Sequence, residues 1–420
     1  MFIKAYKFFI SLLFPLLRIT YVRRRLKRGK EHPTRFNERL GIYTHPRPEG
    51  KLFWFHGASV GEAISMLPLI HKLLAQNPNL SILVTTGTLT SAEIMAKRLP
   101  NRAFHQFVPF DVPKYARRLL NHFKPDAVLW FESELWPSLL SETAGRRIPL
   151  ILINGRISDK SFATWQKFRF IAKELLQCFS LCLGQSQQDQ ERLIALGAKR
   201  VECFGNIKYA AMPLPVDDDK LAYLQKAIHN RPVFLISSTH RDEEVQLARL
   251  LPQMKEKIPQ MLTIIVPRHP NRGGEICASL QQLGYQVAQR SLNQNINNKT
   301  EIYLADTIGE MGLWYRLAEV TFVGGSLVAH GGQNFMEPAR DHNAVIIGPY
   351  MHNFNDMTMR ALHAAAVYKV ESAQEVIDKA MSLFLNPQNL KKQQNNAFQW
   401  TLKEAQVLDS IVTVLKQELK

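Results

Sequence analysis

Glutamates follow apolar segments at two places in the amino-terminal half of the chain, and the first of them is Glu62. The segment 56–62 reads HGASVGE, so glycine and serine precede this acid at an expected helix start. A carboxylate there is stabilised by the helix dipole, whereas at the mouth of a cleft it could serve as a general base. The spacing alone leaves both interpretations open. Ser59 and Gly61 belong to the same loop and are expected to line the cleft.

The second acidic place is the segment 130–138, WFESELWPS, which contains Glu132 and Glu134. Strand alternation would place both carboxylates on one face, and carboxylates that share a cleft raise each other's pKa. A pair of surface acids is the alternative. The flanking Trp130 and Trp136 favour a partly buried pair with a catalytic role.

The segment 324–338, GGSLVAHGGQNFMEP, is a glycine-rich loop that follows the apolar run EVTFV. Such a loop lets backbone approach a ligand closely, and the helix expected to start at NFMEP offers unpaired N–H groups. This combination suits an anion such as a nucleotide phosphate, although glycine loops also form plain tight turns. The loop residues expected to bind are Gly324, Gly325, Ser326, Gly331, Gly332, Gln333 and Asn334.

Basic side chains come directly after many of the apolar segments. Because the carboxyl ends of parallel strands meet at one edge of a sheet, these cations are expected to line a cleft that suits an acidic substrate and a phosphate leaving group. Neither His240 nor His269 has a partner at metal-ligand spacing, so no metal site is expected. The residues concerned are Arg156 with its neighbour Ser158, Lys208, His240, Arg241, Arg268, His269 and Arg272.

Apolar runs alternate with helical segments from residue 51 onward, and a second such series begins near residue 232. This alternation is typical of parallel sheets covered on both faces, so the chain is predicted to be an α/β protein with two Rossmann-like domains. Prolines and acids at 212–220 mark the break between them. The expected domains are 31–211 and 212–400, followed by a helix over 401–420 that could pack back on the first domain.

Residues 1–22 are apolar and aromatic, interrupted by Lys4, Lys7, Pro15 and Arg18, and the basic run RRRLKRGK follows them. The uninterrupted apolar stretch is short for a spanning helix, and the segment lacks the cleavage site of a signal peptide. The segment 1–30 is therefore predicted to be a shallowly inserted or amphipathic membrane anchor. Its basic stripe would face anionic lipid headgroups on the cytoplasmic side. A helix packed on its own domain is the alternative.

The net charge of +17 is concentrated at the amino terminus, where residues 1–51 carry +10. Basic residues next to an apolar helix fit a lipid surface better than nucleic acid, so no nucleic-acid partner is expected. The four cysteines form no CxxC pair, which excludes a sequence-readable disulfide framework or zinc site and fits a reducing compartment.

In these motifs the chain resembles the Kdo transferases, which attach 3-deoxy-D-manno-octulosonic acid (Kdo) to the lipid A precursor. The resemblance runs nearly end to end. It implies a GT-B fold, with two Rossmann-like domains facing across a cleft and a membrane-associated amino-terminal helix. It rests on the order and spacing of the basic amino-terminal segment, HGASVGE, ESELWPS, NGRIS, GNIKY, STHRDEE, PRHPNR, DTIGEMGLWY and GGSLVAHGGQNFMEP.

The resemblance also implies CMP-Kdo as the donor substrate and an inverting mechanism without a required metal or other cofactor. The acceptor would be the lipid A precursor, and the reaction would belong to lipopolysaccharide biosynthesis at the cytoplasmic face of the bacterial inner membrane.

The same resemblance assigns roles to individual residues. Glu62 matches the proposed general base, and Glu134, which directly precedes LWP, matches a second essential carboxylate. Arg268 and His269 would contact the donor's phosphate or cytidine, and Lys208 would face its charges. The nucleotide would be held by the loop from Gly324 to Glu337, with Glu337 on the ribose, and beside it would lie Gly309, Glu310 and Met311.

Two positions depart from the family's pattern. Gln333, which cannot be protonated, stands where the family usually has histidine, and Ala210 stands where an acid often follows GNIKY. Three other functions stay open: a GT-B sugar-nucleotide epimerase, a membrane-docked protein that binds acidic sugars without turnover, and a nucleic-acid binder suggested only by net charge. The basic amino-terminal segment argues against the epimerase, which has no need of lipid.

Overall fold

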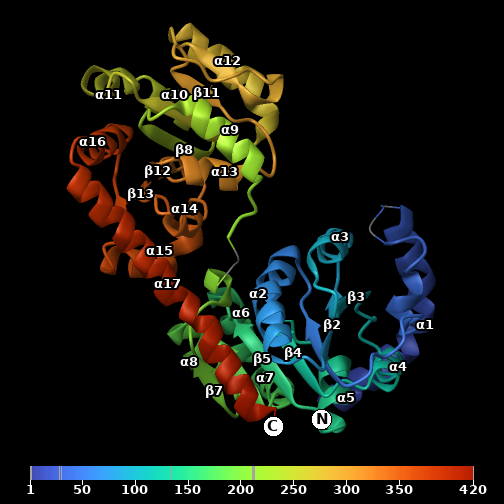
Figure 1. Cartoon of the computed structure of the whole chain (residues 1–420). Helices are drawn as coiled ribbons and strands as arrows, with labels where there is room; N and C mark the ends of the chain where they lie inside the picture. The colour runs from blue at the N-terminus through green and yellow to red at the C-terminus, as the bar shows by residue number, and fades with distance from the viewer. Residues whose placement is uncertain (1, 28, 30, 133, 211–212, 420) are drawn as a thin grey trace. The chain divides into compact units, whose positions relative to one another are not determined.

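The computed structural model describes residues 2–27, 29, 31–132, 134–210 and 213–419. It divides into two compact units: unit 1 comprises Met1–Ala211 with Glu404–Lys420, and unit 2 comprises Met212–Lys403. In each unit, helices cover a central sheet (Figure 1). Residues 211 and 212, where the expected domain boundary falls, lie outside the described residues.

Unit 1 contains a parallel sheet of seven strands in the order β3-β2-β1-β4-β5-β6-β7. Both faces of the sheet are covered, since Phe55 packs in one hydrophobic cluster and its neighbour Trp54 in the other. The strands are β1 Lys51–His56, β2 Leu80–Thr86, β3 Ala103–Phe107, β4 Ala127–Phe131, β5 Leu150–Gly155, β6 Leu181–Gly184 and β7 Val201–Cys203. The helices that follow them are α2 Val60–Gln76, α3 Leu89–Arg98, α4 Pro113–Phe123, α5 Pro137–Gly145, α6 Asp159–Lys167, α7 Arg169–Leu176 and α8 Gln187–Leu196.

Unit 2 contains a second parallel sheet of seven strands, in the order β10-β11-β9-β8-β12-β13-β14. The strands are β8 Val233–Thr239, β9 Leu262–Pro267, β10 Val287–Gln289, β11 Ile302–Leu304, β12 Val320–Val323, β13 Ala344–Ile347 and β14 Val367–Lys369. The helices are α9 Asp218–Ile228, α10 Glu243–Ala248, α11 Leu251–Lys257, α12 Gly273–Gln282, α13 Met311–Leu317, α14 Met336–Arg340, α15 Asn355–His363 and α16 Ala373–Phe384.

These two parallel sheets confirm the predicted α/β fold with two Rossmann-like sheets. Each predicted apolar run contains a strand, but the edge strands β3 and β14 match none of these runs. The runs are KLFWFH, SILVTT, AVLWF, PLILING, LCLG, VECF, PVFLISST, LTIIVP, QVAQ, EIYL, EVTFV and AVII.

In both sheets the chain order reverses beside the first strand: β1 lies between β2 and β4, and β8 lies between β9 and β12. Ligands of open parallel sheets bind beyond the carboxyl ends of the strands at such a switch point. The loops after β1 and β4, and those after β8, β9 and β12, are therefore the positions where functional groups are expected.

Helix α1, Phe2–Lys27, packs one face on unit 1. Lys7 pairs with Glu142 at 2.6 Å, and the Phe14 ring lies 5.0 Å from that of Phe110. This face of α1 therefore packs on its own domain, which was the alternative to a membrane anchor.

The outward face of α1 is also apolar. Phe8, Phe9, Leu12 and Leu13 are between 46% and 66% exposed. Among the described residues, no helix combines the length and apolar character needed to cross a bilayer. Membrane association of α1 stays a prediction, and residues 28 and 30 of its basic stripe lie outside the described residues.

Helix α17, Pro387–Glu418, is longer than the helix expected over 401–420, because Pro387 already suits the first turn of a helix. Its part from Glu404 belongs to unit 1. There Ile411, Val412 and Leu415 join the hydrophobic cluster that contains Phe55.

Replacing Ile411, which is 2% exposed, by alanine is expected to destabilise unit 1 by about 2–5 kcal/mol, because a packed core loses a buried side chain. Lys416→Ala on the exposed face of the same helix should change the free energy of unfolding by less than about 0.5 kcal/mol. Denaturant unfolding of the full chain measures both changes. Equal effects of the two substitutions would contradict the packing of α17 on unit 1.

Candidate active site

Glu62 lies in the first turn of α2, where it completes a reciprocal pair of hydrogen bonds. The Glu62 amide donates to the Ser59 hydroxyl at 3.2 Å, and the Ala58 amide donates to the Glu62 carboxylate at 2.7 Å. These bonds satisfy helix-start N–H groups much as a capping box does, and they fix the carboxylate against its own loop. Gly57 permits this fit, because a Cβ there would lie 2.1 Å from Cε of Met66 and 3.0 Å from Cβ of Glu62.

The other glycine of this loop has no comparable constraint. A Cβ at Gly61 would meet only the Ser59 hydroxyl, at 3.9 Å. The space around position 61 therefore does not require glycine, and the expected place of Gly61 in the cleft stays a prediction. Ser59 caps the start of helix α2.

The environment of Glu62 favours its protonated form. The residue is 7% exposed, and burial raises the pKa of its carboxyl above the ordinary value, although the bonds from Ser59 and Ala58 oppose this shift. The negative charges of Glu132 and Glu134 raise the pKa further. The three acids singled out in the sequence are therefore close enough to interact electrostatically at one edge of the unit 1 sheet.

Glu132 and Glu134 do not share a strand face, so that prediction was wrong. Strand β4 ends at Phe131, and Glu132 has a φ of 59°, which lies in the left-handed region and interrupts strand alternation. Glu134 accepts from the indole N–H of Trp136 at 2.6 Å, and its backbone carbonyl accepts from that of Trp130 at 2.5 Å. The tryptophans thus hold the turn that carries the acids. Residue 133 lies outside the described residues.

Lys208 compensates one of these charges, since its Nζ lies 2.5 Å from Oε1 of Glu132. The turn of 3-10 helix that carries it, Ile207–Ala210, is tied to the end of β5, because the Ile207 amide donates to the side chain of Asn154 at 3.0 Å. Asn154 is 1% exposed and has a φ of 57°, a conformation that asparagine tolerates well. This positioning residue was missed in the sequence, although it opens the NGRIS motif.

Arg156 and Ser158 of the same motif are exposed after β5. The Ser158 hydroxyl accepts from the Ser161 amide at 3.2 Å and caps α6. Ser158 therefore has a structural role, and a substrate contact for either residue stays a prediction.

In unit 2, histidines and arginines gather at the carboxyl edge of three neighbouring strands. The rings of His240 and His330 stack with 4.1 Å between centroids, and His269 meets His240 edge-on at 5.9 Å. Burial, followed by the positive charges of His330, His269, Arg268 and Arg272, lowers the pKa of His240 to about 4. Arginines gathered beside imidazoles in this way suit an anionic ligand.

His330 was not singled out in the sequence. Gln333, in the same loop, contacts His240, on which His330 stacks. The Gln333 amide nitrogen lies 3.2 Å from Nε2 of His240, which accepts its N–H when the ring is neutral. Gln333 therefore retains a polar contact within the histidine group, while His330 and His240 supply the imidazoles.

A carboxylate of the protein itself occupies the first turn of the glycine-rich loop. Glu243 is fully buried and accepts from the amides of Gly325 at 2.7 Å, Ser326 at 3.1 Å and Leu327 at 3.0 Å. Gly324 allows this close approach, because a Cβ there would lie 2.9 Å from Oε2 of Glu243. The loop amides in this turn therefore already have a hydrogen-bond acceptor within the protein.

This arrangement differs from the expectation that the loop amides and a helix start hold a phosphate. The expected helix is α14, which has only five residues, and its Met336 amide donates to the Asn334 side chain at 3.1 Å. Gly331 and Gly332 have φ values of 90° and 76° and turn the loop back, so that the Gly332 amide donates to Gly325. Side chains of the loop, rather than its first amides, are left as ligand contacts.

Glu337, the expected ribose contact, accepts from Asn334 at 3.0 Å. Burial raises the pKa of its carboxyl, while the bond from Asn334 and the positive charges of Arg340 and Arg268 act in the opposite direction. Arg268 therefore lies close enough to Glu337 for their charges to interact.

Glu310 is held by cations of unit 2. Arg290 donates to it at 2.8 and 3.0 Å, Lys220 at 3.2 Å and Thr307 at 2.6 Å. The Arg290 bonds, as the largest cause, lower the pKa of Glu310 to about 2. Gly309 and Met311 flank this anchored residue at the start of α13, and their contact with a nucleotide stays a prediction.

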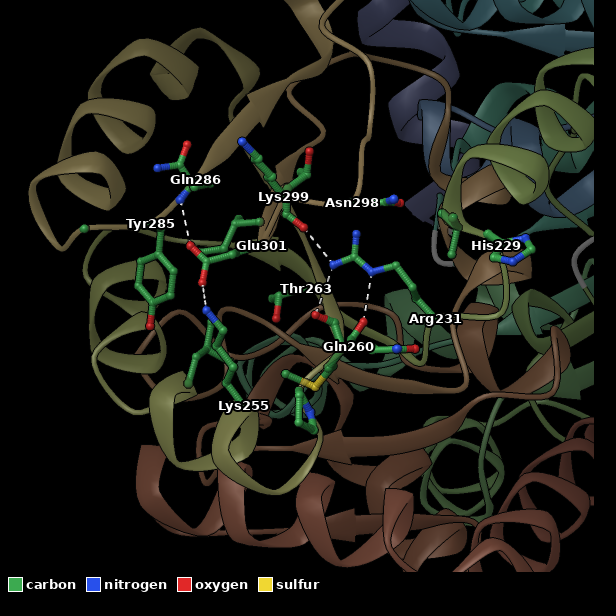
Figure 2. Close-up of a pocket in the computed structure, with 17 residues that line it drawn as sticks. His229, Arg231, Lys255, Gln260, Thr263, Tyr285, Gln286, Asn298, Lys299 and Glu301 are labelled. Atoms are coloured by element: carbon green, nitrogen blue, oxygen red, sulfur yellow. Dashed lines mark hydrogen bonds and ion pairs between the residues drawn. The ribbon is translucent and has the colours of Figure 1, made fainter.

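A cavity of about 900 Å³ lies at the opposite, amino edge of the unit 2 sheet (Figure 2). Arg231 donates there to backbone carbonyls of Gln260 and Thr300, and Lys255 pairs with Glu301. These charges are satisfied by the protein, and no residue singled out in the sequence is among the described residues that line it. We therefore place no substrate in this cavity.

Across the parts of the chain that the structure describes, no three His, Cys, Asp or Glu side chains form a group that could hold a metal ion. At the two sheet edges the structure shows a carboxyl of raised pKa in unit 1, and arginine and histidine side chains in unit 2.

Known proteins are similar in sequence to this chain over nearly its whole length. A family model described as 3-deoxy-D-manno-octulosonic-acid transferase (kdotransferase) matches residues 34–211. The 3-deoxy-D-manno-octulosonic acid transferase of Rickettsia bellii is 32% identical over 415 residues, which is 98% of each chain. That of Haemophilus influenzae is 31% identical over 398 residues, 92% of each chain.

The chain belongs to the 3-deoxy-D-manno-octulosonic acid transferase family. It is therefore a glycosyltransferase, as the sequence motifs predicted. A UDP-GlcNAc 2-epimerase from Neisseria meningitidis has a similar structure, with a TM-score of 0.59, 16% identity, and coverage of 87% of this chain and 100% of that one. At this identity the likeness shows that the fold is shared and does not favour epimerase activity.

Replacing Glu243 of this transferase by alanine is expected to destabilise unit 2 by about 3 kcal/mol or more, because three buried amides lose their acceptor at about 1–3 kcal/mol each. Glu371→Ala, at an exposed position of the same unit, serves as the control and should change stability by less than about 0.5 kcal/mol. Denaturant unfolding measures both. A Glu243→Ala protein as stable as the control would contradict the role of this carboxylate in holding the loop.

Proposed function

We propose that the protein transfers Kdo from CMP-Kdo to a hydroxyl of the lipid A precursor, with inversion at the anomeric carbon. The observation that carries this proposal is the buried Glu62, whose pKa is raised beside Glu132 and Glu134 at the switch point of unit 1. A carboxyl with a raised pKa is a stronger base than an ordinary glutamate, and general-base catalysis works best when the pKa lies near the working pH.

In this mechanism Glu62 takes the proton of the acceptor hydroxyl. The hydroxyl oxygen then bonds to the anomeric carbon of Kdo, while the bond from that carbon to the phosphate oxygen of CMP breaks. Glu132 and Glu134 keep the proton affinity of Glu62 high, and Lys208 offsets part of the negative charge of Glu132. Unit 1 would thus bind the acceptor.

Unit 2 would bind CMP-Kdo. The guanidinium of Arg268 matches the donor's phosphate and carboxylate, and His269 with the stacked His240 and His330 places imidazole groups beside it. Electrostatic stabilisation of the departing CMP by fixed cations is the largest contribution expected of this unit. Glu337, which interacts with Arg268, is the candidate for the ribose hydroxyls, and the backbone at Gly309 and Met311 for the base.

The acceptor is a lipid, so we place the reaction at a membrane surface. The exposed apolar face of α1, with Phe8, Phe9 and Leu12, supports a shallow interfacial attachment, and the basic residues that follow favour anionic headgroups on the cytoplasmic side. An epimerase shares the fold but needs no such surface, and a non-catalytic sugar-binding protein needs no base of raised pKa.

The substitution Glu62→Gln tests the proposed function. It keeps an oxygen that can accept from the Ala58 amide but removes the base, so transfer should fall about 10²–10⁴-fold while the melting temperature is retained. Glu93→Gln, an exposed change on α3, is the control and should leave the rate unchanged.

The assay follows CMP release from CMP-Kdo and the mass of the lipid product, which should increase by one Kdo for each CMP released. A folded Glu62→Gln protein with a near-normal rate would remove Glu62 as the base. Wild-type protein that releases no CMP, or releases it without a heavier lipid, would remove the transferase function itself.

A further inference from the structure

A cavity of about 420 Å³ lies in unit 1, and none of the functions assigned above uses it. It falls within the range of about 300–1,000 Å³ that is typical of small-molecule sites. Its lining residues come from the loops after β2, β3 and β4, that is, from the carboxyl edge where ligands of parallel sheets bind, from α1, and from the segment between α1 and β1. Among them are Tyr6, Gly87, Val108, Phe110, Leu135 and Trp136.

The rim of this cavity touches both loops that carry the catalytic acids. Trp136 donates through its indole N–H to Glu134 at 2.6 Å. Gly87 packs on the other loop, because a Cβ at this position would lie 3.1 Å from the carbonyl oxygen of Ala58, and the Ala58 amide holds Glu62. A ligand in this cavity would therefore lie beside the groups that deprotonate the acceptor.

The polar groups around the cavity are satisfied within the protein. Arg39 pairs with Glu31 at 3.2 Å and donates to the backbone carbonyls of Gly87 at 2.7 Å and Val108 at 3.1 Å. Asp111 accepts from backbone amides at the start of α5. The cavity therefore has no unbalanced charge for an anion such as CMP-Kdo.

The remaining walls are apolar or aromatic, and one of them belongs to α1. Tyr6 faces the cavity from α1, and the next turns of this helix expose Phe8, Phe9, Leu12 and Leu13 to solvent. Contiguous exposed apolar residues mark a surface for lipid or protein. The cavity thus lies between a lipid-compatible helix face and the catalytic acids.

We propose that this cavity binds the acceptor glycolipid at the point where its sugar meets its acyl chains, with the sugar ring against Trp136. This inference rests on the proposed function and adds the place at which unit 1 binds its second substrate. An indole face suits the apolar face of a sugar ring, and the walls formed by Val108, Phe110 and Leu135 suit the first methylenes of an acyl chain.

The test is Leu135→Trp, which fills the cavity without changing a charge. The KM for the acceptor, presented in detergent micelles, should rise about tenfold or more, because the enlarged side chain occupies the space of the sugar and chain, while the KM for CMP-Kdo stays within about twofold. Leu385→Trp is the matched control, since Leu385 is exposed on unit 2, and both KM values should stay unchanged.

A second variant covers the case in which the large side chain prevents folding. Leu135→Ser reduces the side chain and removes an apolar wall, so it should raise the acceptor KM about threefold or more and leave the donor KM unchanged. Thermal unfolding checks both proteins.

An acceptor KM that stays within about twofold of wild type in a folded variant would overturn the proposal, and so would equal rises of the two KM values. These outcomes leave the transferase function intact, because they presuppose active wild-type protein. Failure of the wild type to release CMP in the presence of acceptor would instead overturn the function.

Discussion

The hydrogen bond from the Ala58 amide to the Glu62 carboxylate determines how unit 1 can act. It fixes a buried carboxyl at the switch point of the sheet, within the electrostatic reach of Glu132 and Glu134. Burial and like charge both favour the protonated form, while the amide opposes them, so the carboxyl is held as a base of raised pKa. Gly57 makes room for Glu62 in this position, and the pairing of Lys208 with Glu132 offsets part of the local negative charge.

Unit 2 differs from unit 1 in the side chains at the carboxyl edge of its sheet, which are basic rather than acidic. Glu243 accepts hydrogen bonds from the amides of Gly325, Ser326 and Leu327, so these three amides of the glycine-rich loop are already paired within the protein. The groups left for a ligand at this sheet edge are side chains, namely the guanidinium of Arg268 and the imidazoles of His240, His269 and His330. The division of charge between the units, acidic in one and cationic in the other, matches a reaction that needs a base for one substrate and anion stabilisation for the other.

Much of the fold follows from the apolar runs, because buried parallel strands are apolar on both faces. The sheets differ from the sequence prediction at two of their edges, because β3 contains His105 and Gln106 and β14 contains Tyr368 and Lys369, so neither is a continuous apolar run. The apolar runs also predicted that Glu62 and Arg268 follow the carboxyl ends of strands. The roles of Glu243 and Asn154 were missed, because both depend on contacts between distant segments. Glu243 bonds to the loop after β12, and Asn154 adopts the left-handed conformation and bonds to the turn that carries Lys208.

The pH dependence of kcat/KM for the acceptor tests most directly whether Glu62 is the base. Activity should be lost as the pH falls through a pKa above about 4.3, the ordinary glutamate value, because protonation removes the base. In Glu132→Gln this acid limb should move to lower pH, because a like charge is lost and Lys208 loses its carboxylate partner. An acid limb that does not move in the variant, or a wild-type limb at or below the ordinary glutamate pKa, would contradict the account.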